Sequence, residues 1–358
     1  MAKIVFYCND NLENIQSMEY YRQDIEALRA LGHEVAVCNR YRDIPWRFDV
    51  LFVWWWTYAL FPVFLARLTG RRTIITGVYN FRFEDPSTGT DYFGRPWHQR
   101  LVIRLATMLA HANLFVSSRE FEEVTASFGL RTAHYAPCAV GDAYFAVNGR
   151  AAERTLLLNL AWSGPENLQR KGVWTILDAA ALLKQRGRRF ELVLAGKRGD
   201  GFEALQQRII DLHLSDCVKA IGEVTFEEKL DLFGATKLYL QPSRFEGFGL
   251  ATAEAMASGC CVITTRVGEV PTVVGEDGVY VQPGDSEGLA DMIENLLSAP
   301  NRIAEISNRA AERIQRLFSF AAKKSNFDLI LRSQGIQSRT SSDCIRESPP
   351  EEHASPDC

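Results

Sequence analysis

The sequence lacks the cysteine spacings, the charge excess and the long apolar runs that mark several classes of protein. Its eight cysteines form no Cys-x-x-Cys pair and no cluster with histidine, which excludes a disulfide framework and a zinc site. Forty Lys and Arg against 44 Asp and Glu give a net charge of -4, so no basic excess favours nucleic acid. The opening MAKIVFYCND is too short an apolar stretch for a signal peptide. We therefore expect a cytoplasmic protein with free, mostly buried thiols and no nucleic-acid partner.

One uncharged segment, residues 50–66, raises the question of a membrane span. Its length lies at the bottom of the spanning range. Pro62 and the triplet Trp54-Trp55-Trp56 favour a short buried strand followed by an amphipathic helix, with the tryptophans in the core. A peripheral contact between exposed aromatics, the arginines that follow, and the inner face of a membrane stays open as an alternative that ranks below burial.

The rest of the chain alternates short β-branched or aromatic runs with helix-period segments, which is typical of parallel βα units. The predicted strands are 3–8, 34–38, 49–53, 73–76, 113–116, 156–160, 190–195, 218–221, 237–241 and 261–264. The predicted helices are 18–31, 96–110, 172–186, 202–212, 250–257, 286–297, 302–317 and 318–331. This count and the length predict an α/β protein with two Rossmann-like domains, 1–148 and 149–318, joined by a polar linker. Residues 333–358 are rich in Ser, Pro and Glu, which predicts a disordered tail.

The clearest functional signal follows the strand that ends at Gln241. Gly247 and Gly249 lie in a loop before the next helix, and the unpaired N–H groups of a helix start favour phosphate. Open α/β sheets bind ligands at this end of a strand. Glu254, one turn inside the helix, can accept hydrogen bonds from ribose hydroxyls, and Glu246 can reach the other side of the same ligand. The residues alone predict a phosphorylated ligand, with a tight turn and two solvated glutamates as the alternative.

The amino-acid sequence of this segment resembles the motif of a known family. It reads Pro242-Ser243-x-x-Glu246-Gly247-Phe248-Gly249-Leu250-x-x-x-Glu254-Ala255-Met256-Ala257-x-Gly259. It resembles the Glu-x7-Glu signature of the retaining nucleotide-sugar glycosyltransferases of family 4 (glycosyl transferases group 1), which have the GT-B fold. Over residues 1–332 the resemblance implies two Rossmann-like domains facing each other across a cleft, and a final helix, 319–332, that crosses back to the first. It also implies that Glu246 contacts the transferred sugar, Glu254 the ribose, and the backbone of Gly247, Phe248, Gly249 and Leu250 the sugar and phosphate.

Three other segments agree with this resemblance. Arg170-Lys171-Gly172 looks like the segment whose cations meet the donor diphosphate. Lys197, after a predicted strand, looks like part of a second phosphate-side loop, and Ile221 with the loop 225–229 resembles the region beside the nucleobase. Since the sequence has no Asp-x-Asp, we expect no metal or other cofactor, with Arg170 and Lys171 in the metal's place.

The sequence departs from the family pattern at four places. Pro165 and Glu166 stand where an Arg is usual, so Arg170 or Arg198 must substitute. The last Glu of Gly-Gly-x-x-Glu is missing from 268–272, the loop 9–14 has no paired glycines, and 75–80 has no histidine. The loop 84–94 suits a mobile acceptor-binding loop or a plain connector equally. The acceptor-side candidates are Asp85, Asp91, Trp97, His98 and His111.

These patterns predict transfer of a sugar, with retention and without metal, from a nucleotide-diphosphate sugar to a sugar, lipid-linked or metabolite acceptor. The family resemblance suggests cell-surface polysaccharide or glycoconjugate synthesis. The first alternative is a donor-binding but inactive GT-B subunit that supports a partner enzyme. A nucleotide-sugar epimerase ranks lower, because no acid/base set for proton abstraction is visible. The base, the sugar, the acceptor and the oligomeric state stay open.

Overall fold

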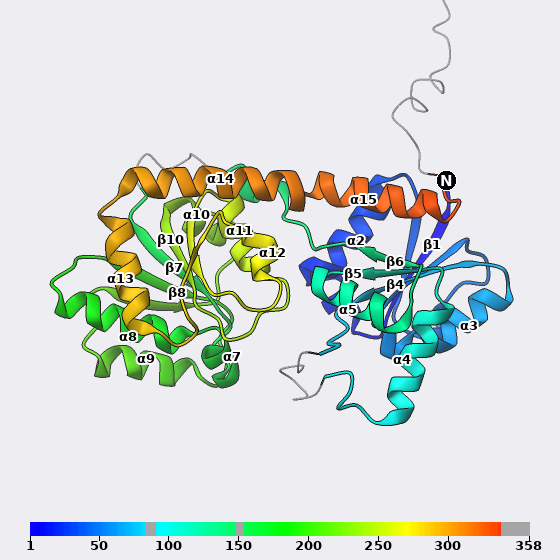
Figure 1. Ribbon diagram of the computed structural model, residues 1–358, viewed down its shortest axis with the longest axis horizontal. Coiled ribbons are helices and arrows are strands. Elements are labelled where there is room, and N and C mark those ends of the chain that lie inside the picture. The colour runs from blue at the N-terminus through cyan, green and yellow to red at the C-terminus, as the bar shows by residue number, and fades with distance from the viewer. Residues whose placement is uncertain (83–90, 148–153, 338–358) are drawn as a thin grey trace, which may run out of the picture. The chain divides into compact units, whose positions relative to one another are not determined.

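The computed structural model describes residues 1–82, 91–147 and 154–337 and divides them into two compact units. The first unit takes the described residues of Met1–Phe115, Glu123–Ala136 and those after Lys323. The second takes Val116–Glu122 and the described residues of Pro137–Lys323. Each unit is built on one parallel six-stranded sheet (Figure 1). The prediction of an α/β fold with two Rossmann-like halves is therefore confirmed.

The sheet of the first unit has the strand order β2-β1-β3-β4-β5-β6. Its central strands pair in register from Ile4 opposite Val50 to Cys8 opposite Trp54. Almost every residue of these strands is buried, as expected where helices cover both faces of a parallel sheet. The six strands are β1 (Lys3–Cys8), β2 (Glu34–Cys38), β3 (Val50–Trp54), β4 (Arg72–Gly77), β5 (Ala112–Phe115) and β6 (Ala133–Tyr135).

The uncharged segment 50–66 forms strand β3, a 3-10 turn at Trp56–Tyr58 and the first part of helix α3 (Leu60–Leu68), so the predicted strand and helix are both present. The helix is not amphipathic as predicted, because its exposed side carries Phe61, Phe64, Leu65 and Leu68. Trp54 and Trp56 are buried, and their indole nitrogens donate to Asp24 at 2.8 Å and Asn113 at 3.0 Å. Across the described parts of the chain, every helix is too short or too polar to span a bilayer.

Most of the last described helix, from Lys324 onward, belongs to the first unit. Helix α15 (Phe320–Ser333) buries Phe327, whose ring centroid lies 5.9 Å from that of Phe52 on β3. Ser333 ends this helix and Ile336 is buried, so the predicted disordered tail, 333–358, begins too early. Residues 338–358 lie outside the described part of the chain. Besides α3, the other helices of this unit are α1 (Leu12–Ser17), α2 (Glu19–Ala30) and α4 (Trp97–Leu109), together with most of α5 (Ser118–Phe128).

The sheet of the second unit has the order β12-β11-β10-β7-β8-β9. The order of connection reverses between β7 and β10, which is the place where doubly wound sheets bind ligands, at the carboxyl ends of the strands. The strands are β7 (Leu156–Leu160), β8 (Glu191–Ala195), β9 (Val218–Gly222), β10 (Thr236–Gln241), β11 (Cys261–Thr264) and β12 (Val279–Tyr280).

Helices cover both faces of this second sheet (Figure 1). One apolar cluster joins α8 (Val173–Gln185), α9 (Phe202–Asp211) and α13 (Ser286–Leu297) to the strands. The opposite cluster joins α6 (Asp142–Phe145), α10 (Phe226–Ala235), α11 (Leu250–Ala257), α12 (Val270–Val274) and α14 (Pro300–Phe318). Residues 225–229, expected as a loop, instead cap and begin α10. The side chains of Thr225 and Glu228 each bond the other's backbone N–H, which satisfies two donors of the helix start.

The cysteines agree with the expectation of free, mostly buried thiols. Cys8, Cys38, Cys138, Cys217, Cys260 and Cys261 are free, and all but Cys217 are buried. Burial raises the pKa of the Cys260 and Cys261 thiols to about 12, so both stay protonated and unreactive at neutral pH. Cys344 and Cys358 lie outside the described residues.

Candidate functional site

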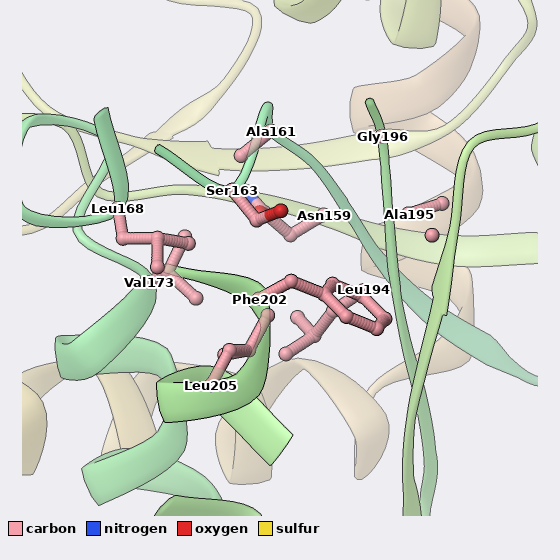
Figure 2. Close-up of a pocket in the computed structure, with 11 residues that line it drawn as sticks. Asn159, Ala161, Ser163, Leu168, Val173, Leu194, Ala195, Gly196, Phe202 and Leu205 are labelled. Atoms are coloured by element: carbon pink, nitrogen blue, oxygen red, sulfur yellow. The ribbon is translucent and has the colours of Figure 1, made fainter. Parts of the chain in front are cut away.

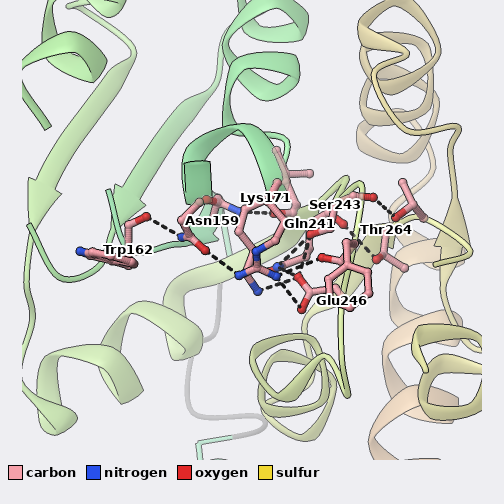
Figure 3. A network of polar contacts seen from close by, with 12 residues as sticks. Asn159, Trp162, Lys171, Gln241, Ser243, Glu246 and Thr264 are labelled. Atoms are coloured by element: carbon pink, nitrogen blue, oxygen red, sulfur yellow. Dashed lines mark hydrogen bonds and ion pairs between the residues drawn. The ribbon is translucent and has the colours of Figure 1, made fainter. Parts of the chain in front are cut away.

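A buried carboxylate, Glu246, lies in the loop after β10 and collects hydrogen bonds from that strand's end (Figure 3). Gln241 Nε2 donates to Glu246 Oε1 at 2.6 Å, and Ser243 Oγ donates to the same oxygen at 2.8 Å. Gln241 and Ser243 are held in turn, because the hydroxyls of Thr264 and Thr265 donate to their carbonyls. The Glu246 carboxylate is therefore fixed at the reversal point of the second sheet.

Two cations from the end of helix α7 (Pro165–Arg170) reach this carboxylate. Lys171 Nζ lies 2.6 Å from Glu246 Oε1, and Arg170 Nη1 lies 3.9 Å from Oε2. Arg170 also donates to Phe245 O at 3.1 Å and to Asn167 Oδ1 at 2.5 Å. The structure thus brings together Arg170, Lys171 and Glu246, the three residues that the family resemblance assigns to the donor diphosphate and the transferred sugar.

The neighbouring cations and hydrogen-bond donors determine the charge state of Glu246. Burial alone would favour the neutral acid. The attraction and hydrogen bond of Lys171, the charge of Arg170 and the bond from Ser243 outweigh burial and hold the pKa of the Glu246 carboxyl below its ordinary value. Glu246 is therefore an ionised acceptor at neutral pH and cannot serve there as a proton donor.

Two glycines allow the backbone segments of the site to meet. A Cβ on Gly172 (φ +70°) would lie 2.2 Å from the carbonyl oxygen of Pro242. A Cβ on Gly268 (φ +53°) would lie 1.6 Å from the carbonyl oxygen of Glu246. Both contacts are impossible for any other residue in this backbone. These glycines therefore bring the α7–α8 turn and the loop after β11 against the Glu246 loop.

Two helices start at this site with glycine N-caps in the left-handed conformation. Gly249 precedes α11 and Gly172 precedes α8, and neither helix start receives a side-chain cap. The first N–H groups of both helices keep their capacity to bind an anion. Gly247 is exposed, with open space where its Cβ would be, and Phe248 is half-buried against Phe318, with ring centroids 5.6 Å apart.

The second glutamate of the motif, Glu254, has a cationic partner of its own. Its carboxylate is buried and lies 2.6 Å from Lys229 Nζ of α10. Lys229 also donates to the hydroxyl of Tyr144 at 2.9 Å. Lys229 lies in the segment quoted for the nucleobase region, but its contact with Glu254 was not predicted, because the two residues come from different helices.

The remaining predicted donor residues lie at the ends of β8 and β9. The carbonyl of Lys197 accepts from Ser163 N at 3.0 Å while its side chain is exposed, and Ile221 is also exposed. The Arg198 guanidinium lies 4.6 Å from the centroid of the Phe202 ring. Of the two arginines considered as substitutes, Arg170 reaches Glu246 and Arg198 stacks on an aromatic ring.

A small cavity lies beneath the loops after β7 and β8 (Figure 2). Its volume is about 10 Å³ and its lining is mostly apolar, with Asn159 and Ser163 as the polar side chains. Asn159 Nδ2 is already bonded to Leu240 O at 2.7 Å. Since such a volume holds about one water molecule, this cavity is part of the packing and not a nucleotide site.

Residues 268–272, which lack the last Glu of the family pattern, contain a buried glutamate one position after Gly268. Glu269 accepts from Ser117 Oγ and from Ser118 N, both at 2.8 Å, and these residues belong to the same unit. The carboxylate caps the start of α5, a role that the sequence did not reveal.

The acceptor-side candidates do not form one cluster in the first unit. His111 lies just after the end of α4, and its Nδ1 accepts from Thr73 N at 3.1 Å. Burial, followed by the charges of Arg67 and Arg72, lowers the pKa of His111, which fits a neutral structural role.

The other candidates give no stronger signal. Asp91 accepts from Gly94 N at 2.7 Å in a turn, and Trp97 and His98 are exposed on the first turn of α4. Asp85 and most of the loop 84–94 lie outside the described residues. Within residues 1–82, 91–147 and 154–337, no three His, Cys, Asp or Glu side chains gather closely enough to hold a metal ion.

Comparison with known proteins finds relatives of the segment that carries these residues. The family model of glycosyl transferases group 1 matches residues 159–299, which contain Arg170, Lys171, Glu246 and Glu254. The MMP alpha-(1->4)-mannosyltransferase of Mycolicibacterium hassiacum is 29% identical over 214 residues, covering 58% of this chain and 50% of that protein. The O-antigen chain mannosyltransferase of Salmonella typhimurium is 33% identical over 122 residues, covering 34% of this chain and 35% of that protein. The chain thus spans half or less of the length of these relatives.

Solved structures match over almost the whole chain. Sucrose-phosphate synthase of Thermosynechococcus elongatus has a TM-score of 0.70 at 20% identity, covering 94% of this chain and 99% of that one. Anabaena HepE in complex with UDP has a TM-score of 0.72 at 18% identity, covering 92% and 100%. These likenesses establish the fold, and the family match and the curated relatives add the kind of protein. Residues 159–299 thus match the glycosyl transferases of group 1, and the chain has the fold of the GT-B glycosyltransferases.

Proposed function

We propose that this protein transfers a sugar from a nucleotide-diphosphate sugar to a glycan, lipid-linked or metabolite acceptor, with retention at the anomeric carbon and without a metal ion. The observation that carries the proposal is the cluster of Arg170, Lys171 and Glu246 beside two uncapped helix starts. The mannosyltransferase relatives and the UDP complex of HepE support a nucleotide donor and a role in glycan synthesis.

The cluster suits the departure of a nucleoside diphosphate. The bond between the anomeric carbon and a β-phosphate oxygen breaks, and its electron pair stays on the phosphate. The acceptor oxygen bonds to that carbon and gives its proton to the departing diphosphate. Arg170, Lys171 and the free N–H groups of α8 and α11 stabilise the charge that develops, and losing one such group costs about 10²–10³-fold in rate.

Glu246 and Glu254, each paired with a lysine, would accept hydrogen bonds from the donor. Glu246, with its lowered pKa, would accept hydrogen bonds from hydroxyls of the transferred sugar and at the same time hold Lys171 in place. Glu254 would accept from the ribose, with its carboxylate held by the ion pair with Lys229. The backbone of residues 247–250 leaves room for the donor, because nothing fills the space beside Gly247.

The proposal is tested first by binding and then by transfer. Melting of the protein against UDP, GDP, ADP and their sugar conjugates should show a shift with one base, because a ligand at 100 times its Kd adds about 2.7 kcal/mol. Lys171→Met should lower turnover about 10²–10³-fold with little change in donor affinity, and Glu254→Gln should weaken nucleotide binding. Lys219→Met is the matched control, because Lys219 forms an exposed ion pair with Glu191 away from these residues.

The outcomes separate the proposal from its alternatives. A retained anomeric configuration in the product and a rate unaffected by EDTA would support it. Donor binding without hydrolysis or transfer would favour an inactive subunit that supports a partner enzyme. Exchange of deuterium from solvent into the donor would favour an epimerase. Unchanged kinetics in both the Lys171 and Glu254 variants would refute the site assignment.

A further inference from the structure

The guanidinium of Arg170 lies beside the Glu246 carboxylate without forming a hydrogen bond to it. The distance from Arg170 Nη1 to Glu246 Oε2 is 3.9 Å, which is beyond hydrogen-bonding range. Nη1 donates instead to Phe245 O at 3.1 Å, and Nη2 donates to Asn167 Oδ1 at 2.5 Å. Both acceptors are neutral, although a carboxylate is the stronger acceptor for a cation. The surrounding residues therefore keep Arg170 from pairing fully with Glu246.

Asn167 is the side chain placed to do this. It precedes Arg170 by three positions on α7, so the two side chains lie on one face of the helix. The Nδ2 of Asn167 donates to the carbonyl oxygen of Trp162 at 2.5 Å. A carbonyl oxygen can only accept and a guanidinium can only donate, so these two contacts admit one orientation of the amide. That orientation leaves Oδ1 facing Arg170.

The Trp162 carbonyl belongs to a loop that is itself fixed by hydrogen bonds. Ser163 N donates to Lys197 O at 3.0 Å, and Gly201 N donates to Ser163 O at 2.9 Å. Gly199 N also donates to Ser163 Oγ at 3.0 Å. These bonds join the loop after β7 to the loop after β8. The contacts that run from Trp162 through Asn167 to Arg170 thus begin on well-anchored backbone.

We propose that Asn167 is a positioning residue, which holds the Arg170 guanidinium short of Glu246 and keeps its charge available to the diphosphate of the donor. Lys171 already pairs with this carboxylate at 2.6 Å, so Arg170 is the less compensated of the two cations. Without Asn167, the long and flexible arginine side chain would turn to Glu246, and the negative charge of Glu246 would offset its own. This inference rests on the proposed function, since it states how the same site binds a diphosphate.

The test is a double-mutant cycle on nucleotide affinity, in which the full chain is titrated with UDP, GDP and ADP in a calorimeter. Arg170→Met should weaken binding of the nucleoside diphosphate at least about tenfold, because it removes charged hydrogen-bond donors. Asn167→Ala should weaken it roughly fivefold. The double variant should bind no more weakly than Arg170→Met alone, because Asn167 acts only through Arg170.

A second substitution separates positioning from simple contact. Asn167→Asp keeps an acceptor for Arg170, but its carboxylate cannot donate to Trp162 O and offsets the charge of the guanidinium. It should weaken nucleotide binding at least as much as Asn167→Ala.

Asn326→Ala is the matched control. Asn326 is half-buried on a helix, as Asn167 is, and its Nδ2 donates to a backbone carbonyl, that of Tyr135, at 2.9 Å. It belongs to the first unit and has no contact with Arg170. This substitution should leave nucleotide affinity unchanged.

The outcomes distinguish this inference from the proposed function. Non-additive losses at Asn167 and Arg170, with the control unaffected, support the inference. Additive losses in the double variant, an unchanged affinity in Asn167→Ala, or wild-type affinity in Asn167→Asp overturns it. If the wild type binds none of the three nucleotides, or if Arg170→Met binds as tightly as the wild type, the proposed function itself fails and this inference fails with it.

Discussion

At the scale of single residues, the two glycines nearest Glu246 have different physical roles. Gly268 has a positive φ, and a Cβ there would overlap the Glu246 carbonyl. Gly247 has open space around it and no positive φ. The first glycine is therefore required by the fold, whereas the surrounding protein atoms do not require the second.

This difference gives a paired prediction. Gly268→Ala should destabilise the protein by at least about 1–3 kcal/mol, because strain and overlap both oppose the native backbone. Gly247→Ala should leave the unfolding free energy almost unchanged and weaken donor binding, because the new methyl group points into the space proposed for the donor. Urea denaturation and nucleotide titration of both variants measure these effects. Equal stability of the two variants would contradict this account of the loop.

The lowered pKa of Glu246 predicts a pH dependence of stability. A carboxyl whose pKa is lower in the folded than in the unfolded state stabilises the fold above the unfolded value of about 4.3. That contribution is lost as the pH falls through the lower folded value. The stability difference between the wild type and Glu246→Gln should therefore be largest near neutrality and shrink under acid conditions. Urea denaturation at a series of pH values tests this, and a difference that grows toward low pH would show that the sign is wrong.

At the scale of elements, the sequence predicted the long and fully apolar strands well. β1, β7 and β11 have the predicted bounds, because buried parallel strands read as continuous apolar runs. The elements that were missed are mostly short. β6 and β12 have three and two residues, and α12 has five, which is too few to show a period. Helix α10 was missed for another reason, since its capping residues were interpreted as part of a ligand loop.

The sequence predicted which residues belong to the site but not which of them contact one another. The Glu-x7-Glu motif indicated Glu246 and Glu254, and the Lys-Gly segment indicated Arg170 and Lys171. The sequence could not show that Lys171 pairs with Glu246, 75 positions away, because β10 and β7 must first lie side by side. In the same way, the contact between Glu254 and Lys229 depends on the packing of two helices.

The capping box of α10 leads to an element-level prediction. Thr225→Ala removes the side-chain acceptor for Glu228 N and should cost about 0.5–2 kcal/mol. Thr225→Asp should restore most of this loss, because Asp is an equally good N-cap. Since α10 carries Lys229, the Ala variant should also bind nucleotide more weakly. Chemical denaturation and nucleotide titration test both effects, and the idea fails if Asp and Ala behave alike.

At the scale of the whole molecule, the first unit depends on the last described helix. Phe327, Ile330 and Leu331 of α15 are all at most 4% exposed, and burying each such side chain contributes about 1.5–3 kcal/mol. A chain that ends at Lys323 should therefore lose the cooperative unfolding of the first unit, while β7 to β11 of the second keep slow hydrogen exchange. A chain that ends at Gln337 keeps every described residue of the first unit and serves as the control. Hydrogen exchange of the two truncated chains tests this, and a protected first unit without α15 would contradict it.

The same arrangement bears on how the protein is made. The ribosome releases strands β1 to β5 early, but the residues that close their core are synthesised only after the second unit. At about 5–20 residues per second, the interval between Pro137 and Lys323 lasts roughly 10–40 seconds. During this time Phe52 and its neighbours lack the ring of Phe327. The nascent first unit therefore exposes apolar surface throughout the synthesis of the second unit. We expect chaperones at the ribosomal exit tunnel to bind this surface.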